Sequence, residues 1–217
     1  MDDWCYSPPP GPLVVLHEDR DCVVVDKPSG LLSVPGRDPA HAESVLSRAR
    51  ARWPGALDVH RLDLDTSGLL VLATRRKAER SLKAAFRERK VHKRYIARVM
   101  GRVADPEGCI DLPLRRETGR PRSVVDMEAG RAARTRFRVL GWDRASTLVE
   151  LFPETGRSHQ LRVHMAAIGH PILGDRFYAP TSGVEAASRL LLHATEIRFP
   201  QPFHGTPVHV TADPPFP

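Results

Sequence analysis

The most constraining feature of the sequence is a short apolar run, residues 69–73, that directly follows a cluster of polar residues. The run has the length and composition of a buried strand. Residues 60–68 before it contain His, Arg, two Asp, Thr and Ser ahead of a glycine. Polar groups that lead into a buried strand cost free energy unless they are paired or used. Residues 65–68 alone are also typical of a turn. A turn does not require Arg61 or Asp63, so we expect chemistry there.

Length, composition and cysteine usage limit the class of protein. The chain has 217 residues, enough for one large domain or two small ones. No apolar run approaches the ~18 residues of a membrane span, and the acidic start lacks the order of a signal peptide. The three cysteines are odd in number and outside any C-x-x-C pair, as expected of reduced thiols in a cytosol. We therefore expect a cytoplasmic protein without membrane attachment, and a monomer.

The charge favours an anionic partner. Lys and Arg number 33 against 26 Asp and Glu, which gives a net charge of +7. Nucleic acid is the commonest partner of so basic a chain, although many basic proteins bind no anion specifically. The cations are also clustered. Residues 77–90 predict an amphipathic helix with a basic outer face, and Arg134, Arg136 and Arg138 alternate along a predicted strand.

Periodicity and turn residues predict an α+β fold with a largely antiparallel sheet. Residues 1–12 form a Pro-rich, extended leader. Besides residues 69–73, strands are expected at 13–16, 22–25, 93–99, 134–140, 148–152, 191–199 and 206–212. Residues 105–131 read as a long excursion with weak strands. Helices are expected at 42–53, at 77–90, at 184–190 and after Ser158, where Leu161, Met165 and Ile168 would face the core up to Gly169.

Several chemistries can be compared with these residues. A metal site could use Asp63, Asp65, His60, His159 and His164, but the last two histidines are five residues apart and no H-E-x-x-H occurs. Ser67 is not in a G-x-S-x-G elbow, and no phosphate-binding loop is present. A single aspartate acting without metal or cofactor remains. A guanidinium would keep such a carboxylate ionised, and we expect Arg162 to pair with Asp63.

An aspartate of this kind could attack a sugar carbon or a pyrimidine ring, or act there as a base. In a basic protein its substrate would be a nucleotide in RNA, which must be flipped out to be reached. Tyr95 offers a flat face to stack on the flipped base, and Arg61 offers a long cation to fill the vacated place.

Residues 60–68 read His-Arg-Leu-Asp, two further residues and Thr-Ser-Gly, and they are accompanied by stretches 27–31, 93–97, 155–164, 169–178 and 191–194. In this order the stretches resemble the motifs of the RluA family of pseudouridine synthases, from about residue 13 onward. The resemblance implies the family's fold, a largely antiparallel mixed sheet with flanking helices around a central RNA-binding cleft. It also implies isomerisation of uridine in RNA without a cofactor.

The resemblance further implies roles for single residues. Asp63 corresponds to the catalytic aspartate, Tyr95 to the active-site tyrosine, Arg162 to the basic partner of the aspartate, and Arg61 to the residue that replaces the flipped base. Whether the aspartate attacks the ribose or removes its proton stays open, as does the choice for Tyr95 between stacking and proton transfer. The other motif residues that we expect to bind the substrate are Lys27, His60, Thr66, Arg157 and His159.

The resemblance is to short members of the family, because only a dozen residues precede the first predicted strand. We therefore expect one catalytic domain, residues 13–217, without an additional N-terminal RNA-binding domain. Short members of this kind act on the tRNA anticodon loop and a 23S rRNA hairpin. Two alternatives stay open: a non-catalytic RNA-binding protein on the same fold, and a metal-dependent phosphoesterase that uses Asp63, Asp65 and the histidines.

Overall fold

The computed structural model describes residues 5–217, which form two compact units. The first unit contains the described residues up to Val91 together with Glu196–Asp213. The second contains His92–Thr195 and Pro214–Pro217. The chain passes from the second unit back to the first within strand β11 (Leu192–Pro200). The expected single domain from residue 13 stays a prediction.

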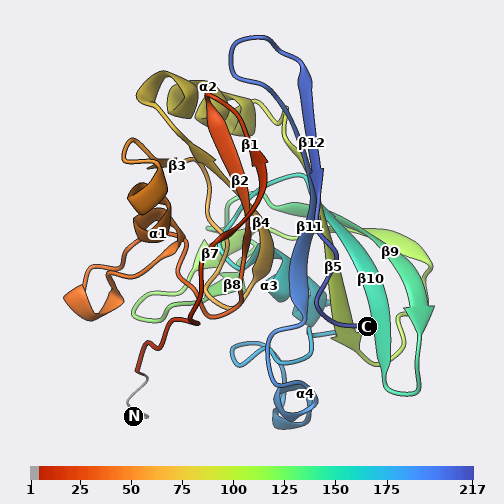
Figure 1. Ribbon diagram of the computed structural model, residues 1–217. Helices are drawn as coiled ribbons and strands as arrows, with labels where there is room; N and C mark the ends of the chain where they lie inside the picture. The colour runs from red at the N-terminus through yellow and green to blue at the C-terminus, as the bar shows by residue number, and fades with distance from the viewer. Residues whose placement is uncertain (1–4) are drawn as a thin grey trace. The chain divides into compact units, whose positions relative to one another are not determined.

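The first unit is built on strand β4 (Ser67–Ala73), every residue of which is buried. Its antiparallel neighbour is β2 (Cys22–Lys27), which in turn pairs with β1 (Val14–Glu18), so that the order is β1-β2-β4 (Figure 1). The short strand β3 (Leu57–Asp58) also pairs with β4. The second part of β11 forms a hairpin with β12 (Pro207–Thr211). The predicted buried strand and the strands expected at 13–16 and 22–25 are confirmed, the first of them one residue later than expected.

The helices of the first unit begin and end at recognisable signals. After the 3₁₀ turn η1 (Pro39–His41), α1 (Val45–Arg52) starts three residues later than predicted because Ser44 caps it, accepting a hydrogen bond from the Ser47 amide at 3.1 Å. The helix α2 (Arg76–Arg87) ends earlier than predicted. Arg89 there has a φ of 57°, which is incompatible with a continuing right-handed helix.

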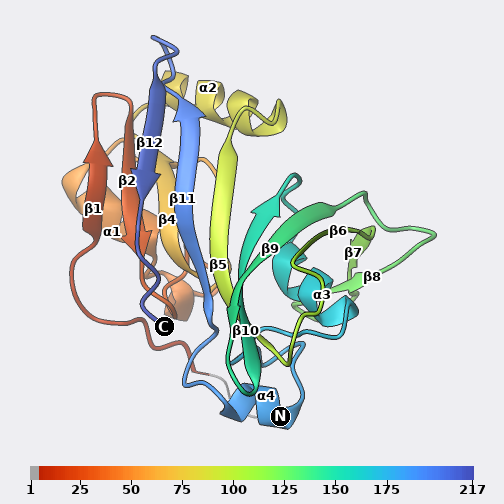
Figure 2. The same ribbon diagram turned by 90° about the vertical axis from the view of Figure 1, so that its right-hand side faces the viewer.

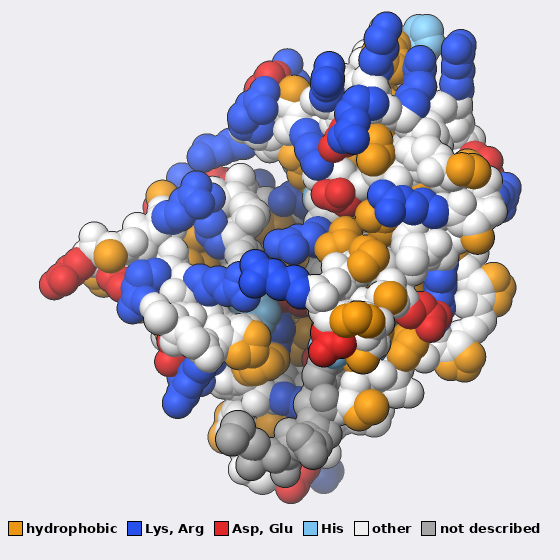
Figure 3. Space-filling view, turned by 90° about the vertical axis from the view of Figure 1, so that its left-hand side faces the viewer, with side chains coloured by type: hydrophobic (Ala, Val, Ile, Leu, Met, Phe, Trp, Pro, Cys, Tyr) orange, Lys and Arg blue, Asp and Glu red, His pale blue; other side chains and the backbone are white. Residues whose placement is uncertain are grey.

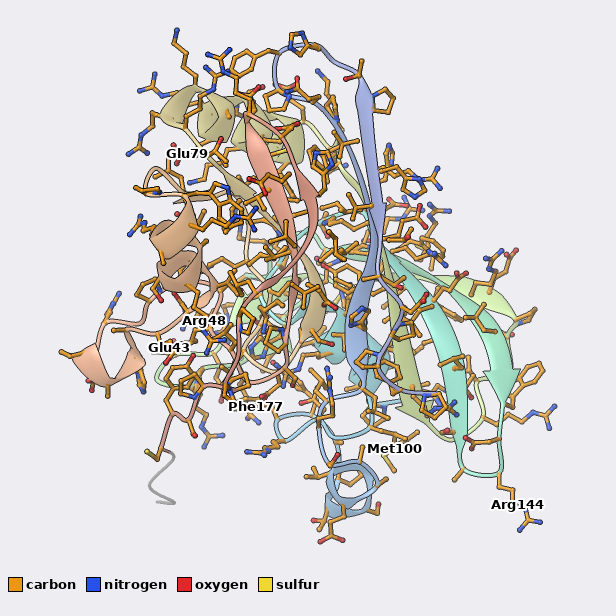
Figure 4. The ribbon with its side chains drawn as sticks, in the orientation of Figure 1. Glu43, Arg48, Glu79, Met100, Arg144 and Phe177 are labelled. Carbon is orange, nitrogen blue, oxygen red and sulfur yellow. The ribbon has the colours of Figure 1, made fainter. Side chains whose placement is uncertain are left out.

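The Pro-rich leader is attached to α1. Its first four residues lie outside the described part of the chain, and residues 5–13 contain neither helix nor strand, as predicted. The Arg48 guanidinium donates hydrogen bonds to the carbonyls of Pro9 (2.6 Å) and Gly11 (2.9 Å) and forms an ion pair with Glu43. Figure 4 shows the side chains of Glu43 and Arg48 next to each other in this region. One arginine therefore holds the leader by its backbone.

The second unit contains an antiparallel sheet with the order β5-β10-β9-β6 (Figure 2). Its strands are β5 (His92–Met100), β10 (Ser146–Pro153), β9 (Arg134–Trp142) and β6 (Glu107–Asp111). Tyr95, Ala97 and Val99, predicted to share one side of β5, are all buried, and Ile96 on the other side is buried too. Along β9, Thr135 and Phe137 are buried, while Arg134, Arg136 and Arg138, which alternate with them, are exposed.

The excursion 105–131 contributes β6 and a small separate hairpin, β7 (Leu114–Arg116) with β8 (Ser123–Val125). This hairpin packs on helix α3 (Gln160–Ala167) through a small core of Leu114, Ala133 and Val163, with Val125 and Tyr178 against it. The weak strands expected in the excursion are thus present.

Three expectations about the second unit are wrong. The N-cap of α3 is His159 and not Ser158, because the backbone turns through a left-handed conformation at His159 (φ 54°). Ile168 follows the helix and is 36% exposed, so it does not face the core. The helix predicted at 184–190 is instead α4 (Thr181–Glu185), which begins earlier because Pro180 provides its extended N-cap.

Every strand pairing described above is antiparallel, and helices accompany the sheets. The α+β class with a largely antiparallel sheet is therefore confirmed. None of the helices within residues 5–217 combines the length and hydrophobicity needed to cross a lipid bilayer.

Candidate active site

The backbone on both sides of Asp63 is fixed by a neighbouring loop. The Ser33 hydroxyl donates to the Leu62 carbonyl (2.7 Å) and accepts from the Leu62 amide (3.0 Å). On the other side of Asp63, the Leu64 carbonyl accepts from the Gly30 amide at 3.0 Å. Leu62 is buried and Asp63 is half-buried. These contacts restrict the position of the Asp63 backbone, and preorganisation of this kind is what a catalytic loop requires.

Lys27 joins the loop 28–33 to the loop that contains Asp63. Its side chain is 0% exposed, and its ammonium donates to the carbonyls of Leu31 (2.7 Å), Leu64 (2.8 Å) and Pro28 (2.9 Å). A buried ammonium needs such acceptors because burial of an unpaired charge is costly. Next to it, the Ser29 hydroxyl donates to the Asp65 carbonyl at 2.7 Å. The structure thus gives Lys27 a role in joining two loops, while its contact with RNA stays a prediction.

The other motif residues before β4 occupy different environments. His60 is half-buried, its Nε2 accepts from the Val71 amide at 3.0 Å, and its ring stacks on Phe86 of α2 with centroids 4.7 Å apart. Because Nε2 accepts, the proton of the neutral ring is on Nδ1. Thr66 is buried, whereas Arg61 is exposed to solvent. Of these three, Arg61 is the side chain that a ligand can reach without rearrangement.

Tyr95 lies in the second unit, on β5, where it is opposite Leu151 of β10 and 9% exposed. Its neighbour Arg94 donates to the buried carboxylate of Glu150 at 2.7 Å. Lys93 points to the same side of the strand as Tyr95. Burial lowers the pKa of Lys93 to about 8. Its position beside Tyr95 makes Lys93 a residue of the site region that sequence reasoning did not select.

The side chain of Arg162 is fixed by an acidic residue and two aromatic rings. Its Nε and Nη2 donate to the two carboxylate oxygens of Asp175 at 2.8 and 2.6 Å, and the two side chains are 3% and 0% exposed. The guanidinium carbon also lies 5.3 Å from the centre of the Phe177 ring and 5.2 Å from that of Tyr178. The bidentate pair and the ring contacts fix both the charge and the plane of the guanidinium.

The turn before Asp175 requires a glycine. Gly174 has a φ of 76°, and a Cβ at this position would lie 1.9 Å from the Arg189 carbonyl oxygen. Any other residue would clash with that backbone and displace Asp175.

His159 is bonded to the same aromatic pair. Its Nδ1 lies 2.8 Å from the Tyr178 hydroxyl, which also accepts from the Ser123 amide (2.8 Å) and donates to the Ser123 carbonyl (3.1 Å). All three contacts are satisfied together when Nδ1 of His159 carries the proton. The Tyr178 hydroxyl therefore ties β8 to the N-terminus of α3. Arg157, two residues before His159, donates to the Ala132 carbonyl at 3.1 Å.

His164 cannot serve as the metal ligand considered from the sequence. It is 0% exposed, its Nδ1 lies 2.9 Å from the Thr135 hydroxyl, and its Nε2 lies 3.0 Å from the Leu112 carbonyl. Both ring nitrogens are thus used within the protein, and burial lowers the pKa of the ring, which keeps it neutral. His164 is a structural residue.

Comparisons with known proteins agree with this arrangement of motifs. Residues 21–167 match the model of the family described as RNA pseudouridylate synthase. The chain belongs to this family. It is 52% identical to the dual-specificity RNA pseudouridine synthase RluA of Yersinia pestis, with 91% of this chain and 97% of that protein covered. Its identity to the protein of the same name from Escherichia coli K12 is 50%, covering 92% and 93%.

Solved structures of pseudouridine synthases share the fold. Human RNA pseudouridylate synthase domain containing 1 has a TM-score of 0.80 and 32% identity over 96% of this chain and 87% of that one. Human RNA pseudouridylate synthase domain containing 4 has a TM-score of 0.75 and 26% identity. The fold predicted from the resemblance is confirmed, and the chain is an RNA pseudouridine synthase. Membership of this enzyme family argues against the two alternatives, a metal-dependent phosphoesterase and a non-catalytic RNA-binding protein.

Sequence reasoning selected candidate catalytic and RNA-binding residues of the motifs, but not the residues that fix their positions by hydrogen bonds and packing. It missed Ser33, Gly174, Asp175 and Tyr178 as parts of the site. Two signals were available: Ser33 interrupts an apolar run, and Asp175 follows Ile172-Leu173-Gly174 at the end of a buried stretch.

Proposed function

We propose that this pseudouridine synthase modifies uridines in two structured RNAs, the tRNA anticodon loop and a hairpin of 23S rRNA. The observation that carries the proposal is the identity of about one half, over nine tenths of both chains, to relatives named as dual-specificity enzymes. The net charge of +7 suits a polyanionic substrate. Nucleotides in loops are partly unstacked, so flipping one of them costs less than in a duplex.

In the proposed reaction, the bond between N1 of uracil and C1′ of ribose breaks, and the uracil ring rotates. C5 then bonds to C1′, the proton leaves C5, and N1 gains a proton. Asp63 acts at the ribose as nucleophile or base, with Arg162 as its basic partner. Tyr95 stacks on the uracil or moves the C5 proton, and Arg61 occupies the place of the flipped base. The anchored backbone around Asp63 supports this assignment.

We also propose that the RNA is bound by the remaining motif residues Lys27, His60, Thr66, Arg157 and His159. Residues 13–217 act as one catalytic domain around an RNA-binding cleft. The enzyme works without a cofactor, as a monomer in the cytoplasm. The free cysteines Cys5, Cys22 and Cys109 suit a reducing compartment. Light scattering during size-exclusion chromatography tests the monomer, for which a mass near 24.2 kDa is expected.

The decisive experiment measures release of tritium from [5-³H]uridine in tRNA and in a 23S rRNA fragment, with EDTA present. The wild type should release tritium from both RNAs, and Asp63→Asn from neither. Asp65→Asn is the matched control, because it removes a carboxylate two residues away in the same loop, and it should retain activity. Release from one RNA alone would contradict the dual specificity. Release by Asp63→Asn would contradict the role of Asp63, and release only without EDTA would contradict a metal-free reaction.

A further inference from the structure

The outer face of α2 carries a row of cations. Ala78, Leu82 and Ala85 are buried on the inner side of this helix. The opposite side presents the α2 cationic face, which consists of Arg76, Lys77, Arg80, Lys83 and Arg87. Arg76 and Arg87 are eleven residues apart, which is about 16 Å along the helix. Figure 3 shows Lys and Arg side chains gathered on the upper part of one side of the molecule, over α2.

The fold uses only some of these charges. Arg75, the N-cap of α2, makes no side-chain capping bond but forms an ion pair with buried Asp21, and Arg76 and Lys77 follow it in the first turn. The positive end of the helix dipole makes cations there unfavourable, by about 0.3–1 kcal/mol each. A cation in this turn without a carboxylate partner, such as Lys77, is better explained by a bound anion than by folding.

Two acidic residues neutralise only part of the face. Glu79 is 7% exposed and accepts hydrogen bonds from Lys83 (2.9 Å) and Arg76 (2.7 Å), which lower its pKa. Asp58 forms a further ion pair with Lys83 at 3.4 Å. Within residues 5–217, Lys77, Arg80 and Arg87 are exposed and form neither an ion pair nor a hydrogen bond. Figure 4 places Glu79 on α2. The face therefore retains three cations that are available to a ligand.

An exposed aromatic ring extends the face at its N-terminal end. Phe203, in the turn between β11 and β12, is 46% exposed, and the guanidinium of Arg75 lies 4.6 Å from its ring centre. The Ser81 hydroxyl donates to the Pro202 carbonyl at 3.0 Å and thereby attaches this turn to α2. Cations beside an exposed ring are typical of surfaces that bind RNA by phosphate contacts and stacking.

The same helix contacts the motif that contains Asp63. Phe86 of α2 stacks on His60, the residue that precedes Arg61. Both lie in the first unit, so the helix and the loop belong to one compact body. We propose that the α2 cationic face binds the phosphate backbone of the RNA stem beyond the modified loop. This inference rests on the proposed function and adds a second RNA-contacting surface to it.

A surface that binds the stem equally in the ground state and the transition state changes KM and leaves kcat unaltered. We therefore compare wild type with Lys77→Gln/Arg80→Gln/Arg87→Gln on intact tRNA and on a short hairpin of the same loop sequence. Loss of three phosphate contacts should raise KM and Kd for intact tRNA about tenfold or more. The slope of log Kd against log salt should decrease by about 2–3. Values of kcat should stay within about twofold.

The matched control removes the same charge elsewhere. Arg37→Gln/Arg102→Gln/Arg144→Gln replaces three exposed arginines in other segments, and Figure 4 shows Arg144 pointing away from the β9–β10 turn. This control should change Kd less than twofold. With the short hairpin, which lacks the stem, Kd should be similar for wild type and the α2 variant.

Equal effects of the two triple variants would show a general charge effect and overturn the inference. A fall in kcat with unchanged Kd would overturn it as well. The fluorescence anisotropy that gives Kd needs no turnover. Failure of the proposed function, seen as absence of product with wild type, is therefore distinguishable from failure of the α2 surface, seen as an unchanged Kd.

Discussion

Asp63 in the first unit and Arg162 in the second are both fixed in position, but different atoms carry the contacts. Around Asp63, hydrogen bonds from the loop 27–33 reach the backbone of Leu62 and Leu64. Around Arg162, a buried carboxylate and two rings contact the guanidinium itself. The bonds from the loop 27–33 therefore fix the main chain around Asp63, whereas the Asp175 and ring contacts fix the charged group of Arg162. Variants at these contacts test whether the roles proposed for the two residues depend on the two kinds of anchoring.

The largest effect on stability is expected from breaking the Arg162–Asp175 pair. Asp175→Ala leaves a buried guanidinium without this partner and should lower the free energy of unfolding by about 3–5 kcal/mol. Urea denaturation followed by circular dichroism measures the loss. The double variant Arg162→Met/Asp175→Leu removes both charges and should recover most of the stability, yet remain inactive. A loss below about 1 kcal/mol for Asp175→Ala would show that the pair is not a structural anchor.

The second prediction concerns Lys27, the anchor of the Asp63 loop. Lys27→Met keeps the length of the side chain but removes three donors, and it should cost about 2–3 kcal/mol of stability. Because small displacements of a reactive group are costly, kcat should fall about 10–100-fold. Measurement of Kd by anisotropy separates two roles. An unchanged Kd supports anchoring alone, whereas a raised Kd supports the direct RNA contact that the family resemblance implies.

Sequence patterns predict the strands better than the contacts that fix the candidate site residues. The strand β9 follows from its period-two pattern, because one face is buried, and β4 follows from its continuous apolar run, because both faces are buried. The cap of α3 does not follow, because the left-handed conformation of His159 is supported by a tertiary contact with Tyr178. Likewise, the motif indicates Asp63, but only the fold brings Ser33 to its neighbour Leu62.

A smaller effect is expected from Ser33→Ala. It removes both bonds to Leu62 and should cost about 1–2 kcal/mol, with a drop in kcat smaller than that of Lys27→Met. Ser29→Ala is the matched control, since its hydroxyl bonds to the Asp65 carbonyl, two residues beyond Asp63. Single-turnover tritium release compares the two. If Ser29→Ala reduces the rate as much as Ser33→Ala, the anchoring acts on the whole loop and not locally on Asp63.

The smallest effect concerns Lys93, a partly buried cation that, unlike Arg162, has no ion pair within residues 5–217. Its pKa of about 8 in the folded protein lies below the ordinary value near ~10.4. Between these two values the unfolded chain binds more protons than the folded chain, so stability should rise with pH from about 8 to about 10.4. Below pH 8 both states are protonated and this group contributes no slope.

From pH 7 to pH 9 the expected gain from Lys93 is at most about 1 kcal/mol. Urea denaturation at several pH values gives the free energy of unfolding of wild type and Lys93→Met. The contribution of Lys93 is the difference between the slopes of this free energy against pH for the two proteins. The variant should also be more stable than wild type at pH 7, because it buries no charge. Equal slopes between pH 7 and pH 9 would show that burial does not lower the pKa of Lys93. A carboxylate partner like that of Arg162 would raise this pKa above ~10.4, and a slope of the opposite sign would then appear only above that pH.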